Sequence, residues 1–264
     1  MEFRDDQLRR YARHIILQEV GGVGQARLLG ARVLVVGAGG LGSPLLIYLA
    51  AAGVGTIGVI DDDRVDLSNL QRQIVHDTAR VGQPKVDSAA AALTALNPDV
   101  TIERHHARLT PDNAAGLVAR YDVVADGSDN FATRYLVNDA CFFARKTLVS
   151  AAILQFDGQL TTFKAHEAGD HPCYRCLFPA APAADLTPTC SSAGVLGSLA
   201  GTLGALQATE VVKELLAIGH SLSGELLLYD ALSVTFRKLK VHRRADCALC
   251  GSTPSITSLV GRAA

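Results

Sequence analysis

The sequence predicts an α/β protein with a wound, mostly parallel sheet that antiparallel strands extend. Two observations support this prediction. In the first half, short apolar, β-branched runs such as 32–36 alternate with helical patterns, which is typical of parallel strands buried on both faces. After residue 146, strand-like runs follow that include an alternating one at 234–241, and these fit an antiparallel addition to the parallel sheet.

Length and composition narrow the class further. The 264 residues allow one large α/β domain, and a net charge of −1 gives no sign of binding to nucleic acid or to an acidic membrane surface. The charged start of the chain argues against a signal peptide. The apolar segment 193–208 is shorter than the ~20 residues of a membrane-spanning helix, so we interpret it as part of a buried helix. We therefore expect a cytoplasmic protein whose six cysteines serve as metal ligands or reactive thiols more readily than as disulfides.

Residues 5–17 place apolar side chains at helical spacing and predict an amphipathic amino-terminal helix. Arg13 lies on or near its polar side, together with Arg9 and Arg10. Arginines in such positions usually belong to a solvated face, and the residues alone favour that interpretation.

The run at 32–36 leads directly into the glycine-rich turn Gly37-Ala38-Gly39-Gly40-Leu41-Gly42, and a helical segment follows. In this context Gly37 allows a tight turn, Gly39 lets a phosphate approach the backbone, and Gly42 lets the helix pack closely on the strand. The free N–H groups at the helix start attract anions. A second strand at 56–60 ends in Asp61, whose carboxylate is placed to bind a ribose hydroxyl. The pattern therefore predicts a Rossmann-like nucleotide site.

A polar loop follows Asp61 and contains Ser68-Asn69-Leu70-Gln71-Arg72-Gln73. Because loops at the carboxyl ends of parallel strands face the ligand crevice, we expect Asn69, Arg72 and Gln73 to touch the nucleotide. Lys85 stands at the start of the next helix, where a lysine opposes the helix dipole. A negative group nearby is therefore expected, and a phosphate would serve. A plain surface lysine is the alternative.

A further strand at 121–126 ends in the polar turn Gly127-Ser128-Asp129-Asn130. Asp129 is thus a second carboxylate at the expected crevice, and a carboxylate beside phosphates commonly holds Mg²⁺. The alternative is that Asp129 or Asn130 caps the helix expected at 131–145. A strand at 100–104 and a helix at 111–119 complete the first half.

Cys173, Cys176, Cys247 and Cys250 form two C-x-x-C pairs. Two such pairs give tetrahedral thiolate coordination with no open position, which suits a structural zinc ion. The alternative is one redox dithiol beside an unrelated pair, but a redox C-x-x-C usually begins a helix after a strand, and neither pair clearly does. Cys190 lies just before a predicted helix, whose N-terminus lowers a thiol pKa. It is a candidate nucleophile, with a capping or packing role as the equal alternative.

The second half completes the predicted organisation of one domain, 1–251. Strands are expected at 147–153, 155–163, 225–229 and 234–241, with a long helix at 193–218. The domain divides into the helix 5–17, a nucleotide-binding half 31–150 and an antiparallel, zinc-bearing half 151–251. The short, polar tail 252–264 is expected to be frayed.

Glycine N–H groups, Arg72, Lys85 and Asp129 suit a nucleoside triphosphate with Mg²⁺ better than a dinucleotide. The chain has no Walker A lysine pattern, which argues against an ordinary P-loop kinase. The residues alone favour nucleotidyl transfer, in which an acceptor carboxylate attacks the α-phosphate and diphosphate leaves. Two alternatives stay open. One is an NAD-dependent oxidoreductase, which the glycine turn and Asp61 would suit, and the other is a non-catalytic nucleotide-binding scaffold.

The order of these motifs resembles that of the bacterial E1-like adenylyltransferases, the ThiF/MoeB/HesA family, with the MoeB-like members most similar and the ThiF-like members next. The resemblance covers about Leu8 to Gly251. It is carried by Arg10-Tyr11-Ala12-Arg13, the glycine turn 37–42, Asp61, the motif 68–73, Gly82-Gln83-Pro84-Lys85-Val86, Ser128-Asp129-Asn130 and both C-x-x-C pairs.

The resemblance implies an enzyme that uses ATP and Mg²⁺ to adenylate the C-terminal glycine of a small ubiquitin-like sulfur carrier protein that ends in Gly-Gly. It implies that Asp61 binds the ribose, that Asn69, Arg72 and Lys85 bind the phosphates, and that Asp129 acts through magnesium. It also implies a homodimer in which Arg13 reaches the ATP of the neighbouring subunit, so Arg13 becomes a catalytic candidate.

Several implications concern the steps after adenylation. The loop that carries Cys190 would cross the tail of the carrier. In ThiF-like members the matching cysteine can bond to the carrier, whereas in MoeB-like members adenylation does not need it, so Cys190 is a candidate for sulfur transfer only. Because no rhodanese-like sequence follows Cys250, we expect a separate sulfur donor. The pathway, molybdopterin or thiamine biosynthesis, stays open.

Overall fold

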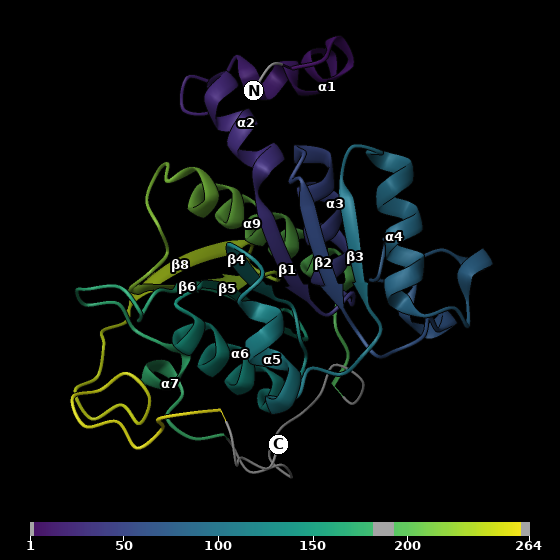
Figure 1. Ribbon diagram of the computed structural model, residues 1–264. Helices are drawn as coiled ribbons and strands as arrows, with labels where there is room; N and C mark the ends of the chain where they lie inside the picture. Colours follow the sequence, from purple (N-terminus) through teal and green to yellow (C-terminus); the bar gives the residue numbers. More distant parts are fainter. Residues whose placement is uncertain (1–2, 182–192, 260–264) are drawn as a thin grey trace.

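One eight-stranded sheet forms the centre of the computed structural model, which describes residues 3–181 and 193–259 (Figure 1). Its strand order is β3-β2-β1-β4-β5-β6-β7-β8. The strands are β1 Arg32–Val36, β2 Thr56–Ile60, β3 Thr101–His105, β4 Val123–Asp126, β5 Thr147–Leu154, β6 Asp157–Phe163, β7 Glu225–Asp230 and β8 Thr235–Lys240. Neighbouring strands in the segment β3-β2-β1-β4-β5 pair in parallel, and those in the segment β5-β6-β7-β8 pair antiparallel. The predicted wound sheet with an antiparallel extension is confirmed.

Helices cover both faces of the parallel part. Helices α3, α4 and α9 pack on one face, and α5 and α6 pack on the other (Figure 1). The helices are α1 Asp5–Ile15, α2 Gly21–Gly30, α3 Gly42–Ala52, α4 Lys85–Leu96, α5 Pro111–Val118, α6 Phe131–Ala144, α7 Tyr174–Leu177 and α9 Gly197–Leu216, with 3₁₀ turns at Leu67–Asn69 and Thr78–Arg80. Among the described residues, none of the helices combines the length and the apolarity that a membrane crossing requires.

Strand β1 shows why the sheet needs helices on both sides. Val33 and Val35 belong to the core shared with α3, whereas Leu34 belongs to the core shared with α5 and α6. Successive side chains of a strand point to opposite faces, so an uninterrupted apolar run must be buried twice. Each of these side chains is fully buried. Truncating Leu34 to alanine would cost about 2–5 kcal/mol of stability.

The glycine-rich turn joins β1 to α3 and has the geometry that its glycines predict. Gly37 has φ = +91°, a left-handed conformation that favours glycine. A Cβ atom on Gly42 would lie 1.9 Å from the carbonyl oxygen of Gly37. Gly42 therefore lets the first turn of α3 sit directly against the turn that precedes it, and the N–H groups of that first turn face the end of the sheet.

Two segments differ from the sequence-based prediction. Helix α2 was not predicted, because four glycines in Gly21–Gly30 lower its helix propensity. It forms because Leu28 is buried in the core and the side chain of Gln25 donates to the carbonyl of Ala52 at 3.0 Å. The tail was expected to be frayed from residue 252. Instead, Ile256 and Leu259 are buried against the core, which orders the tail as far as it is described.

Candidate functional site

A cavity of about 360 Å³ opens at the carboxyl ends of β1, β2 and β4. We call it the switch-point cavity, because β2 and β3 follow β1 on one side and the chain then crosses back to β4 on the other side of β1. Ligands of open α/β sheets bind where the strand order reverses in this way. Nine of the residues predicted from the sequence line it: Gly37, Gly39, Gly40, Asp61, Arg72, Gln73, Lys85, Asp129 and Asn130. The structure therefore brings together residues from Gly37 to Asn130, which lie 93 positions apart in the sequence.

Asp61 ties the glycine-rich turn to the loop after β2. Its Oδ2 accepts a hydrogen bond from the N–H of Ala38 at 2.8 Å, and its Oδ1 accepts one from the N–H of Asp63 at 2.8 Å. The carboxylate stays half-exposed at the cavity wall, and each oxygen has a further lone pair for a ligand hydroxyl.

His76 holds the same turn from the other side, and no pattern in the sequence had pointed to it. Its Nε2 lies 2.9 Å from the carbonyl oxygen of Ala38, and its Nδ1 lies 2.8 Å from the hydroxyl of Ser88 on α4. Burial lowers the pKa of His76, because an apolar surrounding disfavours the charged imidazolium. Ala38 is thus fixed through both its N–H and its carbonyl, which sets the direction of the glycine-rich turn.

Lys85 reaches the cavity from the first residue of α4. Its side chain is only 5% exposed, and its Nζ lies 2.7 Å from Oδ2 of Asp63. The expected negative neighbour of Lys85 is therefore present in the chain itself, as a carboxylate that is 67% exposed. A buried ammonium needs such a partner, since an unpaired charge would be strongly destabilising.

Arg72 stands on the turn that the motif 68–73 forms. Its backbone N–H donates to the carbonyl of Asn69 at 3.1 Å, and its guanidinium donates to the carbonyl of Ser68 at 3.3 Å. Ser68 and Asn69 themselves do not line the switch-point cavity. Their part in this structure is to shape the turn that presents Arg72 and Gln73, and Gln73 is buried with an Oε1 that lacks a partner among the described residues.

Asp129 and Asn130 follow β4 and take different roles. Asn130 is the N-cap of α6, because its Oδ1 accepts a hydrogen bond from the N–H of Thr133 at 2.9 Å. The capping alternative is thus confirmed for Asn130. Asp129 is exposed at the rim of the cavity, where its carboxylate is accessible to a hydrated cation.

A second, larger cavity of about 830 Å³ adjoins the first. We call it the sheet cavity, because it is lined mainly by β5 to β8 and by aromatic and aliphatic residues near α7. Four residues line both cavities: Asp129, Asn130, Arg134 and Ile153. A chain that lies along the sheet cavity can therefore pass its end into the switch-point cavity.

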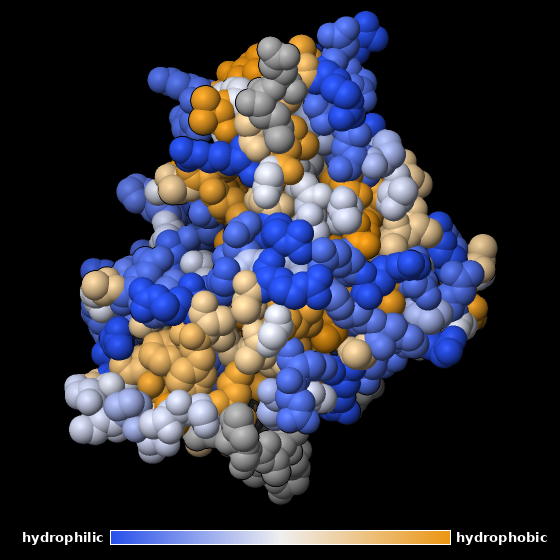
Figure 2. All heavy atoms as spheres, viewed as in Figure 1, coloured by the Kyte–Doolittle hydropathy of each residue, from blue (hydrophilic) through white to orange (hydrophobic). Residues whose placement is uncertain are grey.

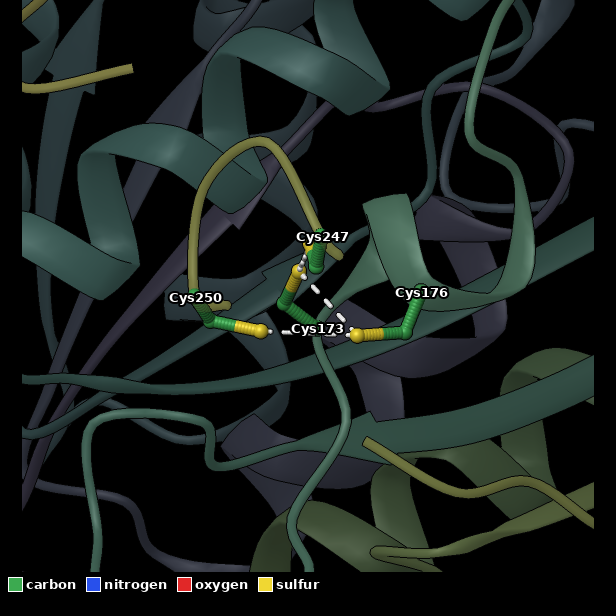
Figure 3. Close-up of side chains that lie close together, drawn as sticks. All are labelled: Cys173, Cys176, Cys247 and Cys250. Carbon is green, nitrogen blue, oxygen red and sulfur yellow. Dashed lines mark hydrogen bonds between the residues drawn. The ribbon is translucent and has the colours of Figure 1, made fainter. Parts of the chain in front are cut away.

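The four paired cysteines converge at the far end of the second half. Their side chains point toward one another in Figure 3, and all four are buried. The Sγ atoms of Cys173 and Cys247 are 3.5 Å apart, and those of Cys176 and Cys250 are 3.4 Å apart. Zn–S bonds of ~2.3 Å in a tetrahedron place sulfur atoms about 3.8 Å apart, so the arrangement fits a zinc ion.

Helix α6 connects the cysteine cluster to the switch-point cavity. The carboxylate of Asp139 pairs with the guanidinium of Arg175, inside the first C-x-x-C pair, through two hydrogen bonds of 2.8 Å. Oδ1 of Asn138 accepts a hydrogen bond from the N–H of Tyr174 at 2.8 Å. The same helix begins beside Asp129, so the cluster supports the element that carries one wall of the cavity.

Gly42, Ser68 and Asn69 stand next to the lining residues of the switch-point cavity without lining it, and Arg13 lies far from it. Arg13 is exposed on α1, which packs with α2 at the amino ends of the parallel strands, opposite to the switch-point cavity (Figure 1). Cys190 lies outside the described residues. Conversely, Arg134 lines both cavities although the sequence analysis did not identify it. An arginine inside a predicted helix carries no sequence signal that it faces a ligand.

Comparison with known proteins gives a consistent set of relatives. Residues 11–249 match the ThiF family. The sulfur carrier protein adenylyltransferase of Thermus thermophilus is 51% identical, with 98% of this chain and 97% of that protein covered. The SAMP-activating enzyme E1 of Haloferax volcanii is 54% identical, with 93% of this chain and 89% of that protein covered.

Two further proteins match over a smaller share of their own length. The adenylyltransferase and sulfurtransferase MOCS3 of Bos taurus is 53% identical over 96% of this chain, which spans 55% of that protein. A crystal structure of Escherichia coli MccB with MccA-N7isoASN superimposes with a TM-score of 0.81 at 20% identity and covers 94% of this chain and 76% of that one. At such identity the likeness establishes the fold alone.

Proposed function

The chain belongs to the ThiF family, and from that premise we propose that it adenylates the C-terminal glycine of a small ubiquitin-like sulfur carrier protein, using ATP. The observation that carries the proposal is the 51% identity to the sulfur carrier protein adenylyltransferase of Thermus thermophilus over nearly the whole chain. The cavity supports it, because the predicted cations and carboxylates gather there. Neither the oxidoreductase nor the scaffold alternative finds support in the relatives reported above.

The reaction needs no covalent nucleophile on the enzyme. An oxygen of the carrier's terminal carboxylate attacks the α-phosphorus of ATP, the bond from that phosphorus to the bridging oxygen breaks, and diphosphate leaves. The products are an acyl-adenylate and diphosphate. The enzyme accelerates this step by holding the two reactants in line and by stabilising the negative charge that moves to the leaving group.

Lys85 and Arg72 supply the positive charge in this account. Both line the switch-point cavity, and the glycine-rich turn adds N–H groups at the start of α3. The triphosphate then competes with Asp63 for the Nζ of Lys85, to which that carboxylate is bound in this structure. Asp61 binds the ribose. Ser68 and Asn69 act through the turn that presents Arg72.

Asp129 would hold a magnesium ion, and the exposed carboxylate at the cavity rim fits that role. When bound, Mg²⁺ neutralises charge on the phosphates and helps diphosphate to leave. Asp129 contributes an oxygen ligand, and Asn130 keeps the preceding turn in place as the cap of α6.

We propose that Arg13 completes the site of a neighbouring subunit in a homodimer. Within one subunit Arg13 lies at the end of the sheet opposite to the switch-point cavity, so it can reach such a cavity only in a second copy. Exposed apolar residues near it, including Ile16 and Val23, support an interface there. Figure 2 shows apolar residues on the surface around α1 and α2, at the top of the view.

The four-cysteine cluster would hold a structural zinc ion in the reduced protein. Its closed set of four thiolates leaves no position for a substrate, so the ion would stabilise the second half and take no part in the reaction. The residues that would hold it are Cys173, Cys176, Cys247 and Cys250.

Sulfur transfer would follow adenylation and use a separate donor protein. Molybdopterin and thiamine biosynthesis are the two pathways that the proposed carriers serve. Cys190 is the candidate for this later step. Changing Cys190 to alanine should leave adenylation intact and impair transfer of sulfur, and loss of adenylation would contradict this role.

The proposed function is tested by isotope exchange between ATP and labelled diphosphate. Exchange should appear only when a carrier that ends in Gly-Gly is added, because the reverse reaction needs the acyl-adenylate. A carrier whose terminal glycine is deleted is the matched control. Exchange without carrier, or none with any Gly-Gly carrier, would contradict the proposal.

A further inference from the structure

Arg134 of α6 lies where the switch-point cavity and the sheet cavity meet, and it lines both. Its Nη2 donates to the carbonyl oxygen of Ser128 at 2.9 Å, and its guanidinium lies 5.6 Å from the ring centre of Phe131. The head group is held at the junction by these contacts and by a side-chain hydrogen bond with Tyr174, whereas Arg72 and Lys85 line only the switch-point cavity.

The Nε of Arg134 is buried and has no hydrogen-bond partner among the described residues. A buried N–H without an acceptor costs about 1–3 kcal/mol, more when the group is charged. No ion pair of Arg134 is found in the described part of the chain either. The junction thus presents a positive charge that forms no ion pair with the described residues, and its buried Nε adds a donor without an acceptor.

The ionisable groups nearest to Arg134 leave its Nε without an acceptor. Asp126 is fully buried at the end of β4, and burial raises its pKa, which favours the neutral acid, while Arg134 opposes that rise. Burial also raises the pKa of Tyr174 to about 12, so this phenol stays neutral near pH 7. Oxygens of Asp126 are already bound by the N–H of Ser128 and the hydroxyl of Ser150.

We propose that Arg134 binds the terminal carboxylate of the substrate tail as it passes from the sheet cavity into the switch-point cavity, so that this residue selects a free carboxylate. The inference rests on the proposed function. A guanidinium presents N–H groups in a planar fork that matches a carboxylate, and Arg134 lines both cavities at the place where the tail would pass. Held this way, one carboxylate oxygen is oriented toward the nucleotide while Arg72 and Lys85 stay on the phosphates.

The test uses a Gly-Gly carrier in two forms, one with its free terminal carboxylate and one with a terminal carboxamide. Dissociation constants are measured by calorimetry in the presence of Mg²⁺ and α,β-methylene-ATP, whose methylene bridge prevents release of diphosphate. The wild-type protein should bind the carboxylate form roughly 10- to 100-fold more tightly, as expected for a charge-assisted hydrogen bond. Arg134→Gln should bring that ratio close to one and leave the affinity for the ATP analogue unchanged.

Two further variants separate binding from a structural role. Arg134→Lys should keep part of the preference, because a positive charge remains at the junction. Arg104→Gln should keep all of it, because this exposed arginine of β3 pairs with Asp87 and lines neither cavity. If Arg134 only balances Asp126, Arg134→Gln would lower the melting temperature and keep the ratio, which would overturn the inference. If the wild-type protein binds neither carrier form, the proposed function itself fails.

Discussion

Asp63 holds Lys85 at both ends: its Oδ2 lies 2.7 Å from the Nζ of Lys85, and its carbonyl oxygen accepts the backbone N–H of Lys85 at 2.9 Å. The lysine is buried and the aspartate is largely exposed. This pair keeps an ammonium at the wall of the switch-point cavity without a ligand present. A triphosphate offers more negative charge than one carboxylate, so it can take over the lysine when it binds.

The first prediction concerns Lys85. Lys85→Ala removes one charge that stabilises the triphosphate as diphosphate leaves, so carrier-dependent exchange should fall by roughly 100-fold or more. Lys238→Ala is the matched control, because this exposed lysine of β8 pairs with Glu225 far from the cavity. Exchange is measured beside circular dichroism, which should show the same fold in both variants. Normal exchange in Lys85→Ala would contradict the assignment.

The second prediction concerns Asp129 and magnesium. Asp129→Asn keeps the size of the side chain but removes its charge, so exchange should fall roughly 100-fold and the required Mg²⁺ concentration should rise. The measurement is a magnesium titration of the exchange rate. Asp112→Asn, an exposed residue of α5 outside the cavity, should behave as wild type. An unchanged magnesium dependence in Asp129→Asn would remove this residue from the site.

The third prediction concerns zinc. Metal analysis should find about one zinc ion per chain, and Cys250→Ser should reduce it and lower the melting temperature by more than about 5 °C. The control is Cys141→Ala, since Cys141 is a buried cysteine of the α6 core outside the four-cysteine cluster. That variant should keep its zinc. A stable, metal-free preparation with full activity would show that the cluster needs no ion.

The fourth prediction concerns the subunits. Arg13→Ala and Lys85→Ala should each be inactive alone. When the two proteins are mixed and allowed to exchange subunits, dimers with one intact site form, and about a quarter of the wild-type activity should return. An inactive mixture of exchanged subunits would place Arg13 in its own subunit's site or outside the mechanism.

The fifth prediction concerns pH and His76. Burial holds the pKa of His76 below its ordinary value of 6.5, so the unfolded chain takes up this proton first as the pH falls. The stability that neutral His76 provides is therefore complete above about pH 6.5 and is lost below it. Urea unfolding at several pH values should show the advantage of wild type over His76→Gln shrinking from pH 8 to pH 5. A difference that stays constant would exclude this role.

Much of the fold and the cavity could be predicted from local patterns. The apolar run of β1, the glycines of the turn and the polar residues after β2 and β4 fix the sheet edge, because each pattern carries its own backbone requirement. Figure 3 likewise shows the four cysteines that spacing alone had paired. These features depend on short stretches of chain.

What could not be predicted depends on contacts between distant segments. Helix α2 forms against α9, and through the hydrogen bond from Gln25 to Ala52 against the end of α3, despite its glycines. Ile256 orders the tail by packing near the cysteines. The pair of Asp63 with Lys85 and the clamp of His76 on Ala38 join residues 22 and 38 positions apart. Arg134 is recognised only once the two cavities are seen to meet.

The most direct test of the account follows the oxygen atoms of the reaction. A Gly-Gly carrier labelled with ¹⁸O in its terminal carboxylate is incubated with the protein, ATP and Mg²⁺, and the acyl-adenylate is cleaved at its carbonyl carbon with hydroxylamine. If the carboxylate attacks the α-phosphorus, the AMP released must carry one ¹⁸O atom. AMP without label, or no AMP formed in the presence of the carrier, would contradict the account.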